Sequence, residues 1–298
     1  MPEPAIVASG LRKAYGDVEA VRGIDLEVGV GEVFGFLGPN GAGKTTTVEI
    51  LEGFRTPTAG SVRVLGEDPA GAGAAWRARI GVVLQESEQD PLLTVRETLR
   101  AYAGYYPAPR DVEETIALVG LDGQADMRAK RLSGGQQRRL DVGLALIGDP
   151  DLLFLDEPTT GFDPSARRAA WGLVAGLREL GKTVFLTTHS MDEAQVLADR
   201  VAIIAHGRIV AEGAPASLGG RERAPTVVRF ALPAGAGPLP PLDGELTVQD
   251  GQAALRTAAP VAALHALTGW ALAHGHELAG LEVGRPTLED VYLELTAE

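Results

Sequence analysis

Residues 38–45 constrain this chain of 298 residues more than any other segment. They read Gly-Pro-Asn-Gly-Ala-Gly-Lys-Thr and match every fixed position of the pattern G-x-x-x-x-G-K-[ST]. The apolar run 32–37 comes before them and the helical pattern 45–53 follows, so the loop joins a predicted strand to a predicted helix. Glycines let successive backbone N–H groups face one anion, and the helix N-terminus adds the positive end of its dipole. The segment predicts a phosphate-binding loop.

The chemistry of phosphate binding assigns a role to the side chains of this loop. We expect Lys44 to reach the β- and γ-phosphates of a nucleotide, and Thr45 to place its hydroxyl on Mg²⁺. The other residues offer backbone N–H groups or lie at the N-terminus of the helix. The residues expected to bind the nucleotide here are Gly38, Pro39, Asn40, Gly41, Ala42, Gly43, Lys44, Thr45 and Thr46.

Two acids follow a second apolar run. Asp156 and Glu157 come directly after residues 152–155, so a predicted strand delivers both at the carboxyl edge of its sheet, where ligands of α/β proteins bind. Asp156 can hold Mg²⁺ through water, as the second metal acid of P-loop NTPases does. Glu157 points the other way along the pleat and is free to polarise an attacking water. The two motifs together indicate a P-loop NTPase.

The pattern of the first 218 residues favours an α/β fold. Short apolar runs suit strands that are buried on both faces of a mainly parallel sheet, and helical patterns lie between them. Region 92–148 is rich in helical pattern, and Thr94 with Glu97 forms a capping box that opens a helix over 95–103. The predicted strands are 32–37, 80–84, 152–155, 184–187 and 201–204, and the predicted helices include 45–53, 167–180 and 191–198.

The composition changes near residue 223, after which charged residues become sparser, and a stretch rich in Gly, Ala and Pro precedes the change. We therefore expect a nucleotide-binding domain over 1–218 with a helical subdomain at about 87–148, a linker over 219–225 and a small α+β domain over 226–298. The strands expected in the small domain are 226–231, 245–249, 253–256 and 277–283, with helices over 257–276 and from Thr287.

The helix expected over 257–276 contains no Asp, Glu, Lys or Arg and is long enough to span a bilayer. It is mostly alanine, however, and its larger apolar residues recur every three positions, which indicates one face of a soluble helix. The last helix has a similar apolar pattern and is expected to pack on its own domain. The apolar residues are Val261, Leu264, Leu267 and Trp270 in the former, and Leu288, Val291, Tyr292 and Leu295 in the latter.

A third motif stands between the phosphate loop and the acids. Residues 132–136 read Leu-Ser-Gly-Gly-Gln, and Ser133 with Gln136 also fits a capping box, which makes an anion site at a helix N-terminus. With the two motifs above, this segment resembles the signature sequence of the ABC ATPase family. The resemblance implies that Ser133, Gly134 and Gly135 bind the γ-phosphate of ATP held by an opposite subunit. Such proteins work as head-to-tail dimers around two ATP molecules.

Four further positions match that family in order. The resemblance implies that Tyr15 stacks on adenine, and that Gln85 contacts Mg²⁺ and water and senses a membrane partner. It implies that Asp163 lies in the D-loop beside the nucleotide and that His189 is the switch histidine on the γ-phosphate. The match covers about 4–218 and implies a P-loop NTPase core of ABC ATPase type. The implied catalytic residues are Glu157, His189 and Gln85, and the implied metal-binding residues are Thr45, Gln85 and Asp156.

Two segments indicate which group within the ABC ATPase family this chain resembles. Residues 35–46 and 286–295 are similar to the separate ATPase subunits of ABC-2-type exporters, a group that includes daunorubicin-resistance-like ATPases. That similarity implies an integral membrane permease as partner, docked in a groove beside Gln85 that residues 86–93 line. It also implies a peripheral place on the cytoplasmic face of the cell membrane, and a regulatory or dimer-stabilising role for the tail.

The composition of the chain argues against several other functions and partners. The net charge of −13 argues against nucleic acid as a partner, and the lack of cysteine excludes a disulfide scaffold and a cysteine nucleophile. The alternative function is a non-transport ABC ATPase that acts on translation or DNA, although the span between Lys44 and Leu132 holds no coiled-coil heptads. A regulatory module without hydrolysis and an importer subunit are further alternatives. The sequence is compatible with both a homodimer and a heterodimer of ATPase subunits.

Overall fold

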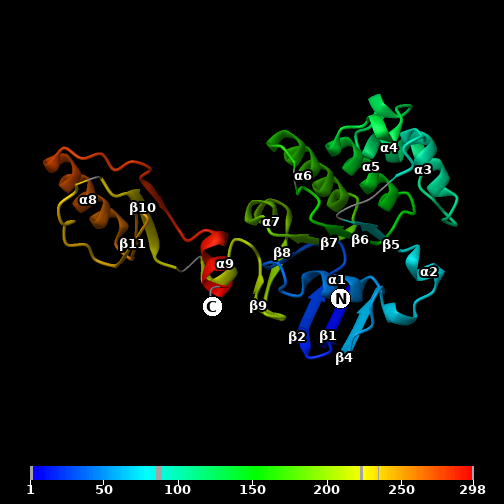
Figure 1. Cartoon of the computed structure of the whole chain (residues 1–298), viewed down its shortest axis with the longest axis horizontal. Helices are drawn as coiled ribbons and strands as arrows, with labels where there is room; N and C mark the ends of the chain where they lie inside the picture. Colours follow the sequence, from blue (N-terminus) through cyan, green and yellow to red (C-terminus); the bar gives the residue numbers. More distant parts are fainter. Residues whose placement is uncertain (1–2, 85–88, 161, 222–223, 234, 297–298) are drawn as a thin grey trace. The chain divides into compact units, whose positions relative to one another are not determined.

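The computed structural model describes residues 3–84, 89–160, 162–221, 224–233 and 235–296. The chain divides into two compact units, with the boundary in the sequence between Pro215 and Ala216 (Figure 1). The start of the linker expected at 219–225 belongs to the second unit, because Leu218 is buried there and Gly219 lies against Val291. The short helix η4 (Leu218–Gly220) and the last helix α9 (Leu288–Thr296) form this contact.

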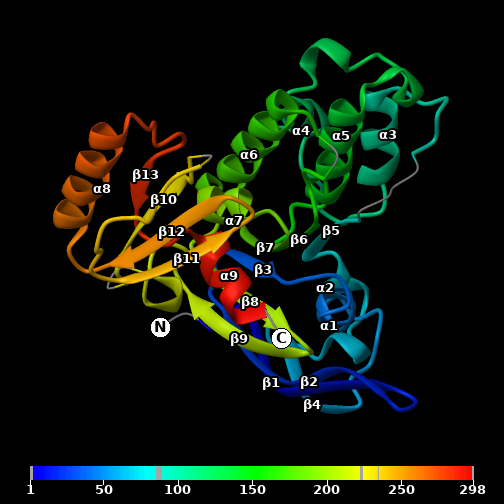
Figure 2. The ribbon, with the colours of Figure 1, turned by 60° about the vertical axis from the view of Figure 1, so that its left-hand side comes forward.

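A six-stranded sheet forms the centre of the first unit, with strand order β5-β6-β7-β3-β8-β9 (Figure 2). Five strands are parallel, and β9 returns antiparallel beside β8. Each apolar run predicted as a strand in the first 218 residues forms one of the five parallel strands. The bounds are β3 (Val33–Leu37), β5 (Ile80–Val83), β6 (Leu152–Asp156), β7 (Thr183–Thr188), β8 (Arg200–Ala205) and β9 (Arg208–Gly213).

Both faces of this sheet are covered, which explains why its strands are apolar throughout. Phe34, Phe154 and Phe185 lie on one face with ring centroids 5.7 Å apart along the row, in a core shared with α1 (Lys44–Leu51). The alternate residues of the same strands form a second core on the opposite face. The helices that supply this second core include α5 (Gly134–Leu146), α6 (Pro164–Glu179) and α7 (Met191–Leu197).

A second sheet, which the sequence analysis did not predict, closes the first of these cores. It is antiparallel with strand order β2-β1-β4. These strands are half-buried and their register shifts in several places, so they lack the continuous apolar runs of the central sheet. The bounds are β1 (Ile6–Tyr15), β2 (Val18–Val28) and β4 (Ala59–Val64).

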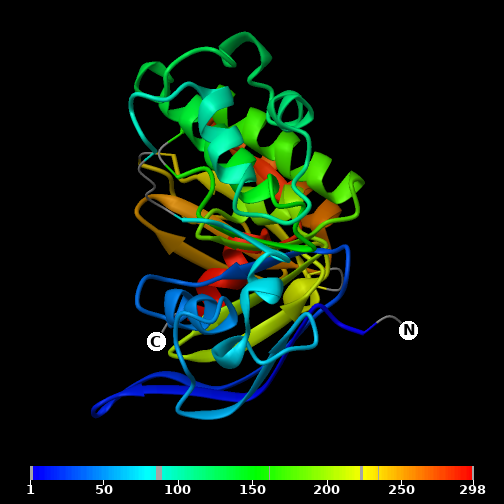
Figure 3. The same cartoon turned by 90° about the vertical axis from the view of Figure 1, so that its right-hand side faces the viewer.

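The helix-rich region expected after residue 92 contains α3 (Val95–Ala103), α4 (Val112–Leu118) and α5. Its capping box is confirmed, since Glu97 N donates to Thr94 Oγ1 at 3.2 Å and Thr94 N donates to Glu97 Oε2 at 2.9 Å. Figure 3 shows these helices in cyan and green, gathered at one end of the first unit. The short helices are η1 (Pro69–Gly71), α2 (Ala74–Arg77), η2 (Asp122–Gln124) and η3 (Ala129–Arg131).

The second unit is a small α+β fold, as the sequence predicts. Its antiparallel sheet has the order β11-β12-β10-β13, and α8 (Pro260–His274) lies on the side of Val228, Phe230 and Leu255. The last strand is shorter than the expected 277–283. The bounds are β10 (Thr226–Ala231), β11 (Glu245–Gln249), β12 (Gln252–Thr257) and β13 (Glu282–Gly284).

The apolar face predicted for α8 is partly wrong. Leu267 and Trp270 are buried, but Val261 is 80% exposed. A spacing of three residues falls short of a helical turn by about 60°, so four such residues spread over half the helix. Leu288 and Val291 of α9 are buried as predicted. Within the described part of the chain, no helix combines the length and the apolar character that a membrane crossing requires.

Candidate active site

The phosphate loop connects β3 to α1, as the sequence predicts. Gly41 and Gly43 adopt positive φ angles of 80° and 105°, which side chains with a Cβ rarely adopt. Gly43 precedes α1 directly, and a Cβ built on it would lie 2.5 Å from the carbonyl oxygen of Ala20. The glycines therefore allow both the turn of the loop and the close approach of β2.

We expect the variant Gly43→Ala to lose about 1–3 kcal/mol of stability and to bind nucleotide more weakly, because its backbone must leave both the turn and the contact with Ala20. Gly41→Ala is the matched control, since its φ is also positive but nothing lies within 4 Å of its Cβ. Urea denaturation compares the two variants. Equal losses of stability would show that the contact with Ala20 adds nothing to the backbone strain.

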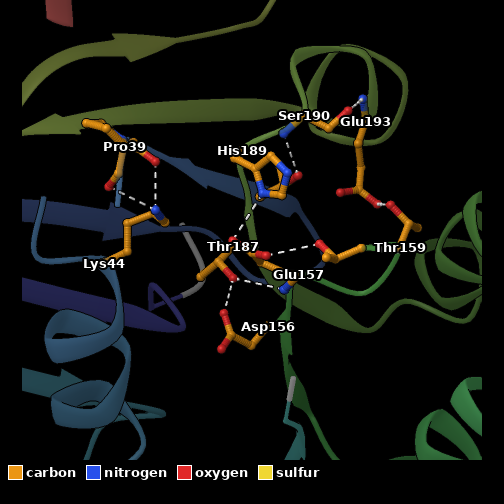
Figure 4. A network of polar contacts seen from close by, with 12 residues as sticks. Pro39, Lys44, Asp156, Glu157, Thr159, Thr187, His189, Ser190 and Glu193 are labelled. Atoms are coloured by element: carbon orange, nitrogen blue, oxygen red, sulfur yellow. Dashed lines mark hydrogen bonds and ion pairs between the residues drawn. The ribbon is translucent and has the colours of Figure 1, made fainter. Parts of the chain in front are cut away.

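Lys44 lies under the loop and is 8% exposed. Its Nζ donates to the carbonyl oxygens of Gly38 at 2.6 Å and Pro39 at 3.1 Å (Figure 4). Burial lowers the pKa of this amine, while the carboxylates of Glu157 and Asp156 act in the opposite direction. The lysine is thus positioned at the base of the loop, with two acids close enough to affect its charge.

The acid pair lies where β6 ends, beside the end of β7. Thr187 Oγ1 donates to Asp156 Oδ1, and Glu157 N donates to the carbonyl oxygen and to Oγ1 of Thr187, both at 3.1 Å. Glu157 has a positive φ of 44°, which is uncommon for a residue with a side chain. Sequence reasoning missed this role of Thr187, although its position on an apolar run that precedes His189 was visible.

His189 extends from the loop after β7 toward Glu157. Its Nδ1 lies 3.2 Å from Glu157 Oε1, and the other carboxylate oxygen of Glu157 accepts a hydrogen bond of 3.0 Å from Thr160 Oγ1. The histidine side chain is 57% exposed, whereas the Glu157 side chain is mostly buried. Figure 4 shows the contact between His189 and Glu157. The glutamate is thus held through both oxygens.

These residues surround one open cavity of about 660 Å³. The glycine loop, the acid pair and His189 thus line the same cavity, although β7 separates β3 from β6. Oxygen groups of Thr45 and Asp156 are of the kind that Mg²⁺ prefers, so the residues present fit both a triphosphate and its metal. The described lining consists of Ala20, Asn40, Gly41, Gly43, Lys44, Thr45, Thr46, Asp156, Glu157 and His189.

Several predicted residues do not line this cavity. Tyr15 is 42% exposed, and its ring carries Lys13 Nζ at 5.3 Å and the Arg55 guanidinium at 5.6 Å from the centroid. Gly38 and Pro39 accept from Lys44 instead, and Ala42 is buried in the loop. Gln85 and residues 86–88 of the expected docking groove lie outside the described residues.

The signature segment lies elsewhere in the same unit. Ser133 caps α5, and its capping box with Gln136 is confirmed by Ser133 N donating to Gln136 Oε1 at 2.9 Å. Asp163 caps α6 by accepting from Ser165 N and Ala166 N at 2.8 and 2.9 Å. Ser133, Gly135 and Asp163 line a second cavity of about 290 Å³, so one chain alone does not bring them to the phosphate loop.

A glycine loop that ends in a lysine lies between a central parallel strand and a helix and shares one cavity with an acid pair and a histidine, which defines a P-loop nucleoside triphosphatase. The sequence matches the family described as ABC transporter over residues 21–160. It also matches the family described as ABC transporter domain-containing protein-like, C-terminal domain, over residues 226–287.

Curated relatives of this chain carry the name Nod factor export ATP-binding protein I, and two of them illustrate the similarity. The one from Paraburkholderia xenovorans is 45% identical over 73% of this chain and 73% of its own length. The one from Cupriavidus pinatubonensis is 41% identical over 99% of this chain and 93% of its own length. Among solved structures, a dimeric ATP-binding cassette in a post-hydrolysis state with ADP and Pi is 26% identical, with a TM-score of 0.62, over 70% of this chain and 98% of that one.

The chain belongs to the ATP-binding proteins of ABC transporters. It is an ATPase of that family, and both the predicted fold class and the resemblance to ABC ATPases are confirmed. The relatives are exporter subunits, so the alternative of an ABC ATPase acting on translation or DNA is not favoured.

Proposed function

We propose that this chain binds ATP with Mg²⁺, hydrolyses it within a head-to-tail dimer and thereby drives export through a separate membrane permease of ABC-2 type. The observation that carries this proposal is the single cavity that joins Lys44 to Asp156, Glu157 and His189. A cavity of about 660 Å³ is of the size that small-molecule and cofactor sites have. The names of the relatives support the direction of transport.

Binding begins at the phosphate loop. Lys44 Nζ exchanges the carbonyl oxygens of Gly38 and Pro39 for oxygens of the β- and γ-phosphates. The exposed hydroxyl of Thr45 and the carboxylate of Asp156 are the groups that would hold Mg²⁺. The metal neutralises charge on the phosphates when it is bound. Thr187 keeps Asp156 in place through its hydroxyl hydrogen bond.

Hydrolysis depends on Glu157 and His189. Glu157 accepts from Thr160 on one oxygen and lies beside His189 on the other, so its carboxylate is oriented before the nucleotide binds. It orients and polarises the attacking water, while His189 stabilises charge on the γ-phosphate. Both groups are fixed on strand ends of the central sheet, which favours a precise geometry.

The dimer completes the site. Ser133, Gly134, Gly135 and Asp163 lie away from the chain's own phosphate loop, and the N-terminus of α5 is an anion-binding end. In the proposed dimer they contact the nucleotide held by the other subunit. The solved dimeric cassette supports this arrangement. We propose that Tyr15 stacks on adenine in the same complex and that Gln85 contacts the metal and the attacking water.

The remaining parts serve the membrane partner. We propose that the permease docks beside Gln85 and that the chain is peripheral on the cytoplasmic face of the cell membrane. The second unit matches a C-terminal family that accompanies ABC transporter domains, which supports a regulatory or dimer-stabilising role for it. Affinity purification from native membranes tests this part, since a co-purifying multi-span protein is expected and ribosomes or DNA would contradict it.

Replacing Lys44 with alanine is expected to weaken ATP binding by about 10- to 100-fold, because a charge-assisted contact to phosphate is worth roughly 1.5–3 kcal/mol. The control is Lys130→Ala, which removes an exposed lysine of the short helix η3 that does not line the cavity of the phosphate loop. Titration calorimetry with ATP and Mg²⁺ measures both variants. An unchanged affinity in the Lys44 variant would refute the assignment of the phosphate loop.

A further inference from the structure

The carboxyl ends of β5 and β6 share one hydrogen-bond donor. Arg138 Nη1 donates to the carbonyl oxygen of Leu84, the residue after β5, and its Nη2 donates to the carbonyl oxygen of Asp156 at 2.6 Å. At the ends of parallel strands some carbonyl groups have no hydrogen-bond partner in the sheet. The guanidinium of Arg138 donates hydrogen bonds to two such carbonyl oxygens at the same time. It does so at the residue that carries the first acid of the active site.

Arg138 lies on α5, five positions after Ser133, and is 8% exposed. Burial lowers the pKa of its guanidinium, while the carboxylates of Asp141, Asp156 and Glu193 act in the opposite direction. A buried cation costs desolvation energy, so its presence is poorly explained by stability alone. Its geometry, with one planar group bridging two strand ends, fits the positioning of the backbone between them.

A second buried side chain holds the same segment from the other side. Thr159 Oγ1 donates to Glu193 Oε1 at 2.8 Å, and Glu193 is 1% exposed (Figure 4). Glu193 belongs to α7, which Ser190 caps immediately after His189. The helix that begins beside the switch histidine is therefore tied to the loop that follows Glu157.

Glu157, which has a strained backbone conformation, lies in the chain between these two contacts. Glu157 has its positive φ one residue after the carbonyl that Arg138 binds and two residues before Thr159. Such a conformation persists only when the surroundings fix it. We propose that Arg138 and Glu193 are positioning residues for ATP hydrolysis, which hold residues 156–159 from α5 and α7 so that the Glu157 carboxylate faces the γ-phosphate. This inference rests on the proposed function of the same site.

The test for Arg138 compares steady-state hydrolysis by the full chain with Arg138→Met, Arg138→Lys and the control Arg139→Met. The control removes the neighbouring cation, which donates instead to the carbonyl oxygen of Gly120 at 3.2 Å. We expect Arg138→Met to lower kcat by about 10- to 100-fold with little change in KM for ATP, as supporting partners of active-site groups do. Arg138→Lys keeps the positive charge but cannot donate to both carbonyl oxygens, so its kcat is expected to lie between that of Arg138→Met and that of the wild type.

The outcomes separate the two proposals. If the wild-type chain hydrolyses ATP and Arg138→Met retains its kcat, the positioning role is overturned while the proposed function stands. Equal losses of kcat in Arg138→Met and Arg139→Met would also overturn the positioning role, because they would indicate a general need for positive charge on α5. Should Arg138→Met not fold, Arg138→Lys gives the decisive value, and a wild-type kcat in that variant overturns the proposal. A wild-type chain without hydrolysis would refute the proposed function itself.

Glu193 is tested with a conservative pair. Glu193→Gln keeps an oxygen that accepts from Thr159, whereas Glu193→Ala loses it. We expect the glutamine variant to stay within about threefold of the wild-type kcat and the alanine variant to lose about tenfold or more, with ATP affinity unchanged in both. Matching losses of kcat and ATP affinity in the alanine variant would indicate a merely structural role and overturn the inference.

Discussion

Glu157→Gln is expected to lower the ATP turnover of this chain by about 100- to 1,000-fold and to leave nucleotide binding intact, because the variant lacks the general base. The amide cannot take up the proton of the attacking water. It still offers an oxygen to Thr160 and fits beside His189, so the geometry of the cavity is preserved. Because ATP then persists, the head-to-tail dimer is expected to accumulate.

Phosphate release measures the turnover of this variant, and size-exclusion chromatography with ATP and Mg²⁺ measures its dimer. The matched control is Glu179→Gln, which removes an exposed carboxylate at the end of α6. We expect its turnover to equal that of the wild type. A Glu157 variant that stays monomeric with ATP and Mg²⁺, or that turns over at the wild-type rate, would contradict the role given to this glutamate.

The second large effect concerns stability. Glu52 follows α1 directly and is 7% exposed. Burial, helped by the nearby charges of Asp156 and Glu49, raises the pKa of this carboxyl from 4.5 to about 8. Between pH 4.5 and 8 the folded chain therefore holds a proton that the unfolded chain has released. The contribution of Glu52 to stability is present below this window and is lost as the pH rises through it.

Glu52→Gln removes this dependence, because an amide of the same shape stays neutral. Relative to the wild type, the variant is expected to gain about 4 kcal/mol of stability between pH 4.5 and pH 9, since each unit of pKa difference corresponds to roughly 1.4 kcal/mol. Urea denaturation of both proteins across this range measures the difference. A free-energy difference that does not change with pH would show that Glu52 titrates normally in the folded chain.

Within the first unit, the sequence predicted the strands that are buried on both faces and missed those that are buried on one. Residues 152–155 and 184–187 are continuous apolar runs, because helices and a second sheet cover both sides of them. In β2, by contrast, buried Ile24 and Leu26 alternate with exposed residues, and register shifts interrupt the alternation. A search for apolar runs cannot find such a strand.

Some residues of the candidate site could likewise be predicted from the sequence, and others could not. The phosphate loop and the acid pair could be predicted, because each needs fixed residue types next to one another in the chain. Thr187 and Arg138 could not, since they act on residues of other segments and only the folded strand ends bring them together. The relation of Ser133 and Asp163 to the nucleotide came from family resemblance alone.

The strand order of the central sheet sets the size of the active site. Because β7 lies between β3 and β6, the phosphate loop and the acid pair are two strand spacings apart, which is roughly 10 Å. β7 thus acts as a spacer that leaves room for a terminal phosphate and a water molecule. Its own end supplies Thr187 to one side of that gap, and His189 follows immediately.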